Sequence, residues 1–149
     1  MDKHMLLGKY VLPISTDGWF TLPLDCRQGL SKALYLTQGL DRNLLLFTKN
    51  AFEKIYSHVK SVSITDPAAR LLTRIILGNT VVLGINPAGM IQVPATLYEY
   101  AGFEGEVVLV GQGDYLELWS PITWDKLSDI LRDYNQNVQR FEKFNVPLT

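Results

Sequence analysis

The sequence predicts an α+β fold, mainly β, in which two intertwined β-β-α-β-β-α repeats form one barrel-like core with pseudo-twofold symmetry. The first observation is a diverged internal repeat, in which Gly18 and Pro23 recur at the same spacing as Gly89 and Pro94. The second is size: a unit of about fifty residues is too small to bury both faces of its own sheet. The two repeats should therefore share one core.

The repeat divides the chain into four parts. Repeat 1 covers residues 5–59, a helical connector covers 60–78, repeat 2 covers 79–134, and a tail covers 135–149. Repeat 1 and the connector predict strands at 6–14, 19–22, 33–37 and 44–47, and helices at 23–30, 49–59 and 67–78. Repeat 2 predicts a strand that ends near 85, further strands at 90–93, 107–110 and 115–119, and helices at 95–101 and 121–134.

Turn chemistry places the boundaries of these elements. Asp17-Gly18 is a direct hairpin signal, and Gly89 can adopt the left-handed conformation that leaves a tight turn. Pro94 cannot donate to a sheet but suits the first turn of a helix, and Gly102 ends that helix. The connector helix should be capped by Thr65 or Asp66, with Pro67 at its first position, and Gly111-Gln-Gly113 should be a plain hairpin turn. Pro13 suggests that the first strand lies at an edge of the sheet or ends there.

Composition indicates an ordinary globular protein. The chain has 149 residues, of which 47% are hydrophobic and 19% charged. A single cysteine, Cys26, excludes an internal disulfide and is expected to be buried. No apolar run is long enough to cross a membrane, and residues 1–4 lack the apolar core of a signal peptide. We therefore expect a cytoplasmic protein.

Charge is unevenly distributed, although the net charge is only -1. Residues 1–50 contain six basic and four acidic groups, whereas residues 79–127 contain one basic group, Lys126, and six acidic ones. Contacts with phosphate are therefore expected mainly in the first half. Lys9, Arg27, Lys32 and Arg42 could form a basic patch there, or could simply be solvated.

Several segments together resemble the MraZ family, the duplicated members of the AbrB/SpoVT-like group of swapped-hairpin DNA-binding proteins. They are Thr65-Asp-Pro-Ala-Ala-Arg70, Pro94-Ala-Thr-Leu-Tyr-Glu-Tyr-Ala-Gly-Phe103, Val108-Leu-Val-Gly-Gln-Gly113 and Glu117-Leu-Trp119. The resemblance implies a double-split (swapped-hairpin) β-barrel. It also implies a nucleoid-associated transcriptional regulator that forms a ring-like homo-oligomer and binds repeated DNA boxes upstream of the division and cell-wall gene cluster.

The chain departs from the family in the motif that contacts DNA. Each repeat of the family carries Asp-x-x-Gly-Arg in its first turn, with the arginine as the DNA contact. Here Trp19 and Met90 take the arginine positions, Ser15 and Asn86 take the aspartate positions, and Tyr98 takes the place of a further arginine. Neither tryptophan nor methionine replaces a guanidinium against phosphate or guanine. The candidate DNA-binding residues are Lys9, Ser15, Thr16, Gly18, Trp19, Arg27, Asn86 and Gly89.

Some of these residues, and the function as a whole, have alternative interpretations. Trp19 could stack on a base, but a place in the core or in an oligomer contact is the more common use of such a residue. Arg70 and Arg74 lie one helical turn apart and are expected to pair with a neighbouring acidic group. A second functional hypothesis is an oligomeric scaffold or protein-interaction module of the same fold that has lost DNA recognition.

Catalysis has no positive support in the sequence. No Gly-x-Ser-x-Gly motif is present, and nothing pairs a nucleophile with a base. His4 and His58 have no cysteine or carboxylate at ligand spacing, so no metal site is predicted. We accordingly expect no enzyme, no cofactor, no small-molecule substrate and no membrane partner.

Overall fold

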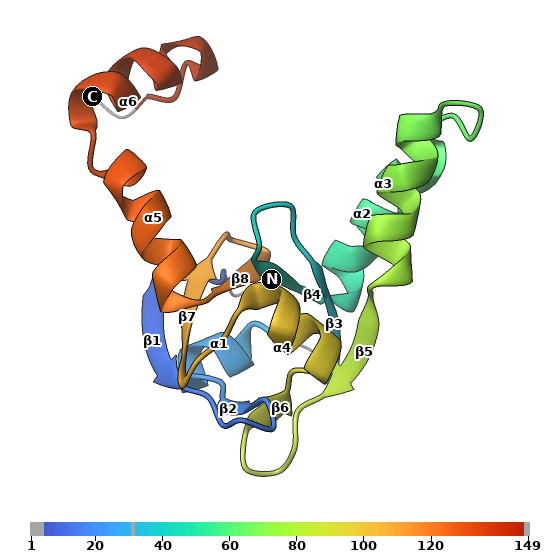
Figure 1. The fold of residues 1–149 in the computed structure, drawn as a ribbon, viewed down its shortest axis with the longest axis vertical. Helices are drawn as coiled ribbons and strands as arrows, with labels where there is room; N and C mark the ends of the chain where they lie inside the picture. Colours follow the sequence, from blue (N-terminus) through green and yellow to red (C-terminus); the bar gives the residue numbers. More distant parts are fainter. Residues whose placement is uncertain (1–4, 31, 148–149) are drawn as a thin grey trace.

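The computed structural model describes residues 5–30 and 32–147, which form a β-sheet body with two projecting helical arms (Figure 1). The strands are β1 (Lys9–Pro13), β2 (Trp19–Thr21), β3 (Ala33–Gln38), β4 (Leu44–Thr48), β5 (Val81–Gly84), β6 (Met90–Gln92), β7 (Glu106–Gly111) and β8 (Tyr115–Trp119). The helices are α1 (Leu24–Gln28), α2 (Lys49–Ser61), α3 (Pro67–Gly78), α4 (Ala95–Ala101), α5 (Pro121–Leu131) and α6 (Tyr134–Phe141), and a 3-10 helix, η1, covers Glu142–Phe144.

The strands pair across the two halves of the chain. Six strands form one antiparallel sheet in the order β1-β7-β8-β4-β3-β5, and β2 pairs with β6 in a separate ribbon. The first strand of each half thus pairs with the third strand of the other half: β1 with β7, and β5 with β3. The predicted α+β class is confirmed, and the strands are paired antiparallel.

Two pairings place residues of the two halves opposite each other. Phe20 of β2 lies opposite Ile91 of β6, and Leu45 of β4 lies opposite Glu117 of β8. The core contains apolar side chains from both halves. Its fully buried members include Phe20, Leu22, Leu34, Leu36, Leu44, Leu46, Ile91, Leu109, Leu116 and Leu118.

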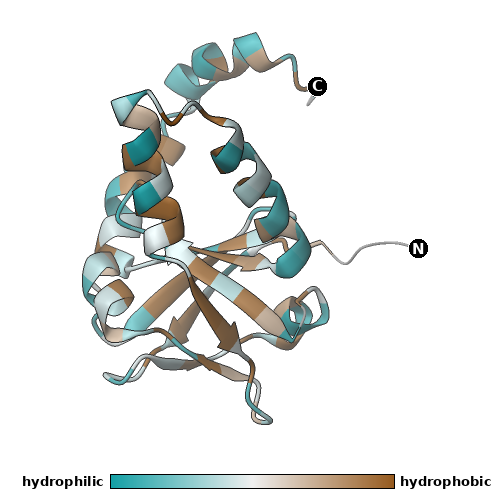
Figure 2. Cartoon of the chain, turned by 90° about the vertical axis from the view of Figure 1, so that its right-hand side faces the viewer, coloured by the Kyte–Doolittle hydropathy of each residue, from teal (hydrophilic) through white to brown (hydrophobic). Residues whose placement is uncertain are grey.

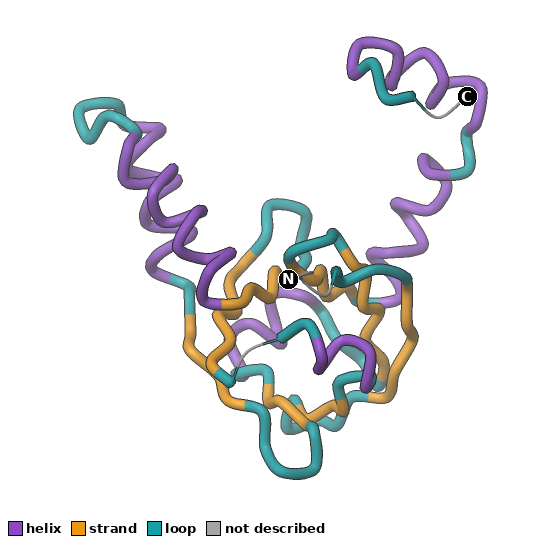
Figure 3. The backbone as a smooth tube through the Cα atoms, turned by 180° about the vertical axis from the view of Figure 1, so that it is seen from behind, coloured by secondary structure: helices purple, strands orange, loops and turns teal. Residues whose placement is uncertain are grey.

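The first arm is α2 with α3, and the second is α5 with α6; both leave the body on the side opposite to β2 and β6 (Figures 1 and 3). Figure 2 shows hydrophobic residues concentrated in the strands and mixed with hydrophilic ones along the arms. Side-chain oxygens of Thr48, Asp66 and Ser120 cap α2, α3 and α5, so the cap of the connector helix is Asp66. No helix among the described residues is long and apolar enough to cross a membrane.

Aromatic pairs anchor both arms to the body in the same way. Phe47 at the end of β4 packs edge-on against Phe52 of α2, with ring centroids 6.1 Å apart. Trp119 at the end of β8 packs edge-on against Trp124 of α5, with centroids 5.6 Å apart. Each arm therefore starts from a strand end that also carries one ring of the pair.

Three sequence-based expectations need correction. The strand expected at 6–14 with a break at Gly8 is continuous only over Lys9–Pro13, because Gly8 has a φ of 90° that interrupts an extended backbone. The helix expected at 121–134 ends at Leu131, because Asp133 caps a new helix by accepting a hydrogen bond from the Gln136 amide at 3.2 Å. Arg70 donates to the Ile64 carbonyl at 2.9 Å in place of an acidic partner.

Candidate nucleic-acid interface

The first candidate turn joins β1 to β2 and is closed by Ser15. The Ser15 amide donates to the Trp19 carbonyl at 2.9 Å, and the Gly18 amide donates to the Ser15 carbonyl at 2.9 Å. The Ser15 hydroxyl accepts from the Trp19 amide at 3.0 Å. Ser15 is therefore a turn-forming residue whose side chain is already engaged by the backbone.

The second candidate turn joins β5 to β6 and repeats this bonding. The Asn86 amide donates to the Met90 carbonyl at 2.9 Å, and the Gly89 amide donates to the Asn86 carbonyl at 2.9 Å. The side-chain oxygen of Asn86 accepts from the amides of Met90, at 2.8 Å, and Ala88, at 3.0 Å. Trp19 and Met90 thus hold equivalent places at the start of β2 and β6.

The turns are linked to each other at one end of the body. The Leu22 amide donates to the Gly89 carbonyl at 2.9 Å, and the Val93 amide donates to the Gly18 carbonyl at 2.8 Å. Gly18 has a φ of 90°, and a Cβ there would collide with the Val93 carbonyl oxygen. The structure therefore brings six of the candidate residues together around one ribbon: Ser15, Thr16, Gly18, Trp19, Asn86 and Gly89.

Arg27 reaches this ribbon from α1. A Cβ added to Gly89 would meet the Arg27 guanidinium, so the side chain lies directly against the second turn. The Nε atom of Arg27 is buried and has no hydrogen-bond partner. Arg27 is therefore a partly buried cation that packs between the halves.

Lys9 lies apart from the turns. It is the first residue of β1, and its ammonium lies 5.7 Å from the centroid of the Trp124 ring on α5. It lies six positions before Ser15, and the chain between them is strand as far as Pro13, so the two residues are up to roughly 20 Å apart at about 3.3 Å per residue. The structure does not bring Lys9 together with the turn residues.

The basic patch considered from the sequence is spread over several elements. Arg42 lies over the Tyr100 ring at 5.4 Å, Lys9 lies over Trp124, and Arg27 lies against Gly89. Lys32, which precedes β3, is exposed. A shared basic surface formed by these four side chains stays a prediction.

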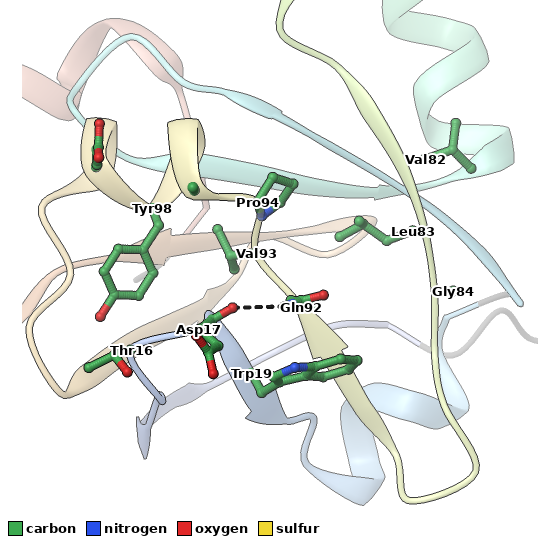
Figure 4. Close-up of a pocket in the computed structure, with 12 residues that line it drawn as sticks. Thr16, Asp17, Trp19, Val82, Leu83, Gly84, Gln92, Val93, Pro94 and Tyr98 are labelled. Carbon is green, nitrogen blue, oxygen red and sulfur yellow. Dashed lines mark hydrogen bonds between the residues drawn. The ribbon is translucent and has the colours of Figure 1, made fainter.

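A pocket of about 790 Å³ opens beside the first turn (Figure 4). Trp19 is half-buried and lines it, so its expected place in the core is wrong, whereas a place in an oligomer contact stays a prediction. Tyr98 lines it from α4 and packs edge-on against Phe103, with ring centroids 5.6 Å apart. The pocket is lined by Thr16, Asp17, Trp19, Val82, Leu83, Gly84, Gln92, Val93, Pro94, Ala95, Tyr98 and Glu99.

Sequence reasoning missed this pocket. It placed Tyr98 at the position of a family arginine and concluded only that a contact was lost. The available signal was the repeat itself, because Arg27 and Tyr98 occupy matching places after Pro23 and Pro94. That match indicates that the space beside each turn is filled differently.

Titratable groups with perturbed pKa values lie away from the turns. Burial and the neighbouring Asp25 raise the pKa of the Cys26 thiol, which is buried as expected. Burial raises the pKa of the Glu117 carboxyl, although hydrogen bonds from Trp119 and Asn43 oppose the shift. Among the described residues, no group of three or more His, Cys, Asp or Glu side chains could hold a metal ion; His4 lies outside those residues.

Comparison with known proteins places these features in a family. A family model described as MraZ protein, antitoxin-like, matches residues 76–144. A protein of Herpetosiphon aurantiacus is 32% identical over 87% of this chain and 90% of its own length. One from Thermomicrobium roseum is 33% identical over 85% and 89%, and one from Caldanaerobacter subterraneus is 28% identical over 95% and 100%. All three are named transcriptional regulator MraZ, and the resemblance found in the sequence is confirmed: the chain belongs to the MraZ family.

Proposed function

We propose that the chain is a cytoplasmic, nucleoid-associated transcriptional regulator that binds repeated DNA boxes upstream of the division and cell-wall gene cluster. The relatives are named transcriptional regulators. The observation that carries the proposal is the pair of turns at Ser15–Gly18 and Asn86–Gly89. They are closed by the same hydrogen bonds and held together by β2 and β6 at one end of the body.

We propose in addition that the halves are two repeats, 5–59 and 79–134, interlocked as a double-split barrel. Reciprocal pairing of equivalent positions, Phe20 with Ile91 and Leu45 with Glu117, supports this view. Such an arrangement presents two similar turns to one DNA segment. A ring of subunits would repeat them along adjacent boxes.

A homo-oligomer is supported by the apolar surface of the second arm. Tyr134 is 74% exposed and Val138 is 66% exposed. Exposed apolar side chains continue along α5, α6 and the chain that follows, where they include Ile122, Ile130, Leu131, Phe141, Phe144 and Val146. Apolar side chains exposed in such number on one arm are often covered by another chain.

DNA binding can be tested by fluorescence anisotropy with a duplex that carries the repeats upstream of the protein's own gene cluster, and with a shuffled duplex. We expect preference for the repeats and strong weakening between low and physiological salt. Arg27→Glu should weaken binding about tenfold, because it inverts a charge beside the turns, and Lys9→Glu should weaken it less, because Lys9 lies apart from them. Lys126→Glu, a change of the same charge on α5, is the control. Equal binding of both duplexes at low salt would reject the proposal.

The scaffold hypothesis is favoured by the replacement of both turn arginines by Trp19 and Met90 and by the acidic balance of residues 79–127. Each missing phosphate contact removes counterion release and flattens the salt dependence of binding. If the chain forms a stable oligomer that binds a protein partner but neither duplex, this second function replaces the first.

A further inference from the structure

The pocket beside the first turn has the size of a ligand site and a distinctive chemistry. Its volume of about 790 Å³ falls within the usual range of small-ligand sites. Two carboxylates, Asp17 and Glu99, line it together with two aromatic rings, Trp19 and Tyr98, and none of the described basic residues does. In the view of Figure 4, Asp17 lies between Tyr98 and Trp19. Aromatic faces combined with carboxylates favour an organic cation.

One wall of this pocket is an edge strand. β5 is the last strand of the six-stranded sheet, and Val82, Leu83 and Gly84 from it line the pocket. Edge strands carry unpaired amides and carbonyls that accept an additional strand, and Val82 is 63% exposed on this one. The pocket therefore suits a cation that is carried on an extended peptide.

Beside the second turn the chain places a guanidinium of its own. There the guanidinium of Arg27 lies against Gly89. At the first turn the corresponding residue is Tyr98, and the atoms nearest to a Cβ added at Gly18 belong to Val93. One half thus places its own arginine beside a turn, whereas in the other half Tyr98 lines a pocket beside the turn.

We propose that this pocket binds an arginine side chain of an extended segment of a partner protein. The guanidinium lies among Trp19, Asp17 and Glu99, and the backbone of the segment adds to the free edge of β5. The acidic character of residues 79–127 attracts such a basic segment. The proposal does not depend on DNA binding, which uses the turn backbone and Arg27.

The test uses the full chain and a fluorescein-labelled peptide, acetyl-Thr-Val-Arg-Val-Thr-amide, with fluorescence polarisation as the readout. A second peptide replaces arginine by citrulline, which has nearly the same shape without the charge. A third carries N-methyl groups that block strand pairing. We expect saturable binding of the arginine peptide, at least tenfold weaker binding of the citrulline peptide, and loss of binding on N-methylation.

Variants locate the peptide on the protein. Trp19→Ala should weaken binding about tenfold, and Asp17→Asn and Glu99→Gln, which alter exposed side chains, should each weaken it about fivefold. Matched controls are Met90→Ala, at the equivalent place in the second turn, and Glu104→Gln, which removes an exposed carboxylate outside the pocket. Both controls should bind as the parent chain does.

Three results would overturn the proposal: equal affinity for the arginine and citrulline peptides, equal weakening by the control variants, or no binding of the arginine peptide. A promoter duplex is titrated in parallel against the same variants. If Glu99→Gln strengthens or weakens DNA binding while the peptide does not bind, the pocket belongs to the nucleic-acid surface. Peptide binding with no DNA binding rejects only the proposed regulator.

Discussion

The first and second turns have the same pattern of backbone hydrogen bonds, but different side chains lie beside them. Ser15 and Asn86 close the turns with equivalent hydrogen bonds. Beside the second turn, Arg27 packs against Gly89 with its Nε atom buried. Beside the first turn, Tyr98 lines an open pocket. Backbone bonding in the two turns is therefore compatible with very different neighbouring side chains.

The comparison distinguishes the residues that maintain the fold from the side chains that could contact a partner. Backbone hydrogen bonds and the two turn glycines hold the β2–β6 ribbon, and neither depends on the side chains at positions 19, 27, 90 or 98. Those four positions carry Trp, Arg, Met and Tyr. The fold can thus retain its ribbon while its contacts with partners change.

The largest effect is expected from an alanine at the turn glycines. Gly18→Ala should lower the free energy of unfolding by about 3 kcal/mol, because a positive φ is combined with a collision against the Val93 carbonyl oxygen. Gly89→Ala should lower the free energy of unfolding by about half as much. Its φ is also positive, but the new methyl group meets the end of the flexible Arg27 side chain, which can move. Urea unfolding followed by circular dichroism at one protein concentration measures both.

Gly102→Ala is the control for these substitutions. It has a φ of 72°, and nothing lies within 4 Å of an added Cβ, so only the backbone term applies. If Gly18→Ala and Gly102→Ala lose equal stability, the collision with Val93 adds nothing to the loss. The proposed difference between the surroundings of Gly18 and Gly89 is then wrong.

A double-mutant cycle tests whether Arg27 sets the difference between the turns. Arg27→Ala combined with Gly89→Ala should lose about 1 kcal/mol less than the sum of the single losses, because the shortened side chain no longer meets the new methyl group. The corresponding pair, Tyr98→Ala with Gly18→Ala, should be additive, because the obstacle at Gly18 is backbone. Additivity in both cycles would show that the two surroundings are energetically alike.

Sequence reasoning could find what depends on local chemistry. Pro94, Gly102 and Asp66 are boundary signals with a mechanism, and the helices begin and end where these residues indicate. The repeat also predicted matching places for Trp19 and Met90, and the amides of these two residues donate to the side chains of Ser15 and Asn86 in the same way. These features follow from φ preferences and missing or available donors.

The rest depends on contacts between distant segments. The pocket arises because β5 and α4 of the second half meet the first turn, and no local pattern indicates which spaces stay open. The break between α5 and α6 was missed because Leu131 and Tyr134 keep a helical spacing that hides the cap formed by Asp133. The position of Arg27 against Gly89 also required three-dimensional packing.

The smallest effect concerns the pairing of Leu45 with Glu117, where the two halves place an apolar and an acidic side chain opposite each other. Burial raises the pKa of Glu117 in the folded chain above its unfolded value of about 4.3. Between these two values the folded state holds more protons, so the stability contributed by Glu117 is present at low pH and is lost as pH rises through the folded pKa.

Glu117→Gln should therefore gain stability relative to the parent chain as pH rises from about 4.3, by less than about 1 kcal/mol because the side chain is only half-buried. Above the folded pKa the difference should become constant. Urea midpoints measured across this pH range for both chains provide the test. A difference that stays constant from acid to neutral pH would mean that the hydrogen bonds from Trp119, at 3.2 Å, and Asn43, at 3.3 Å, fully offset burial of the charge. In that case burial of Glu117 costs no stability relative to its apolar partner Leu45, and the contrast between the halves is confined to the turns.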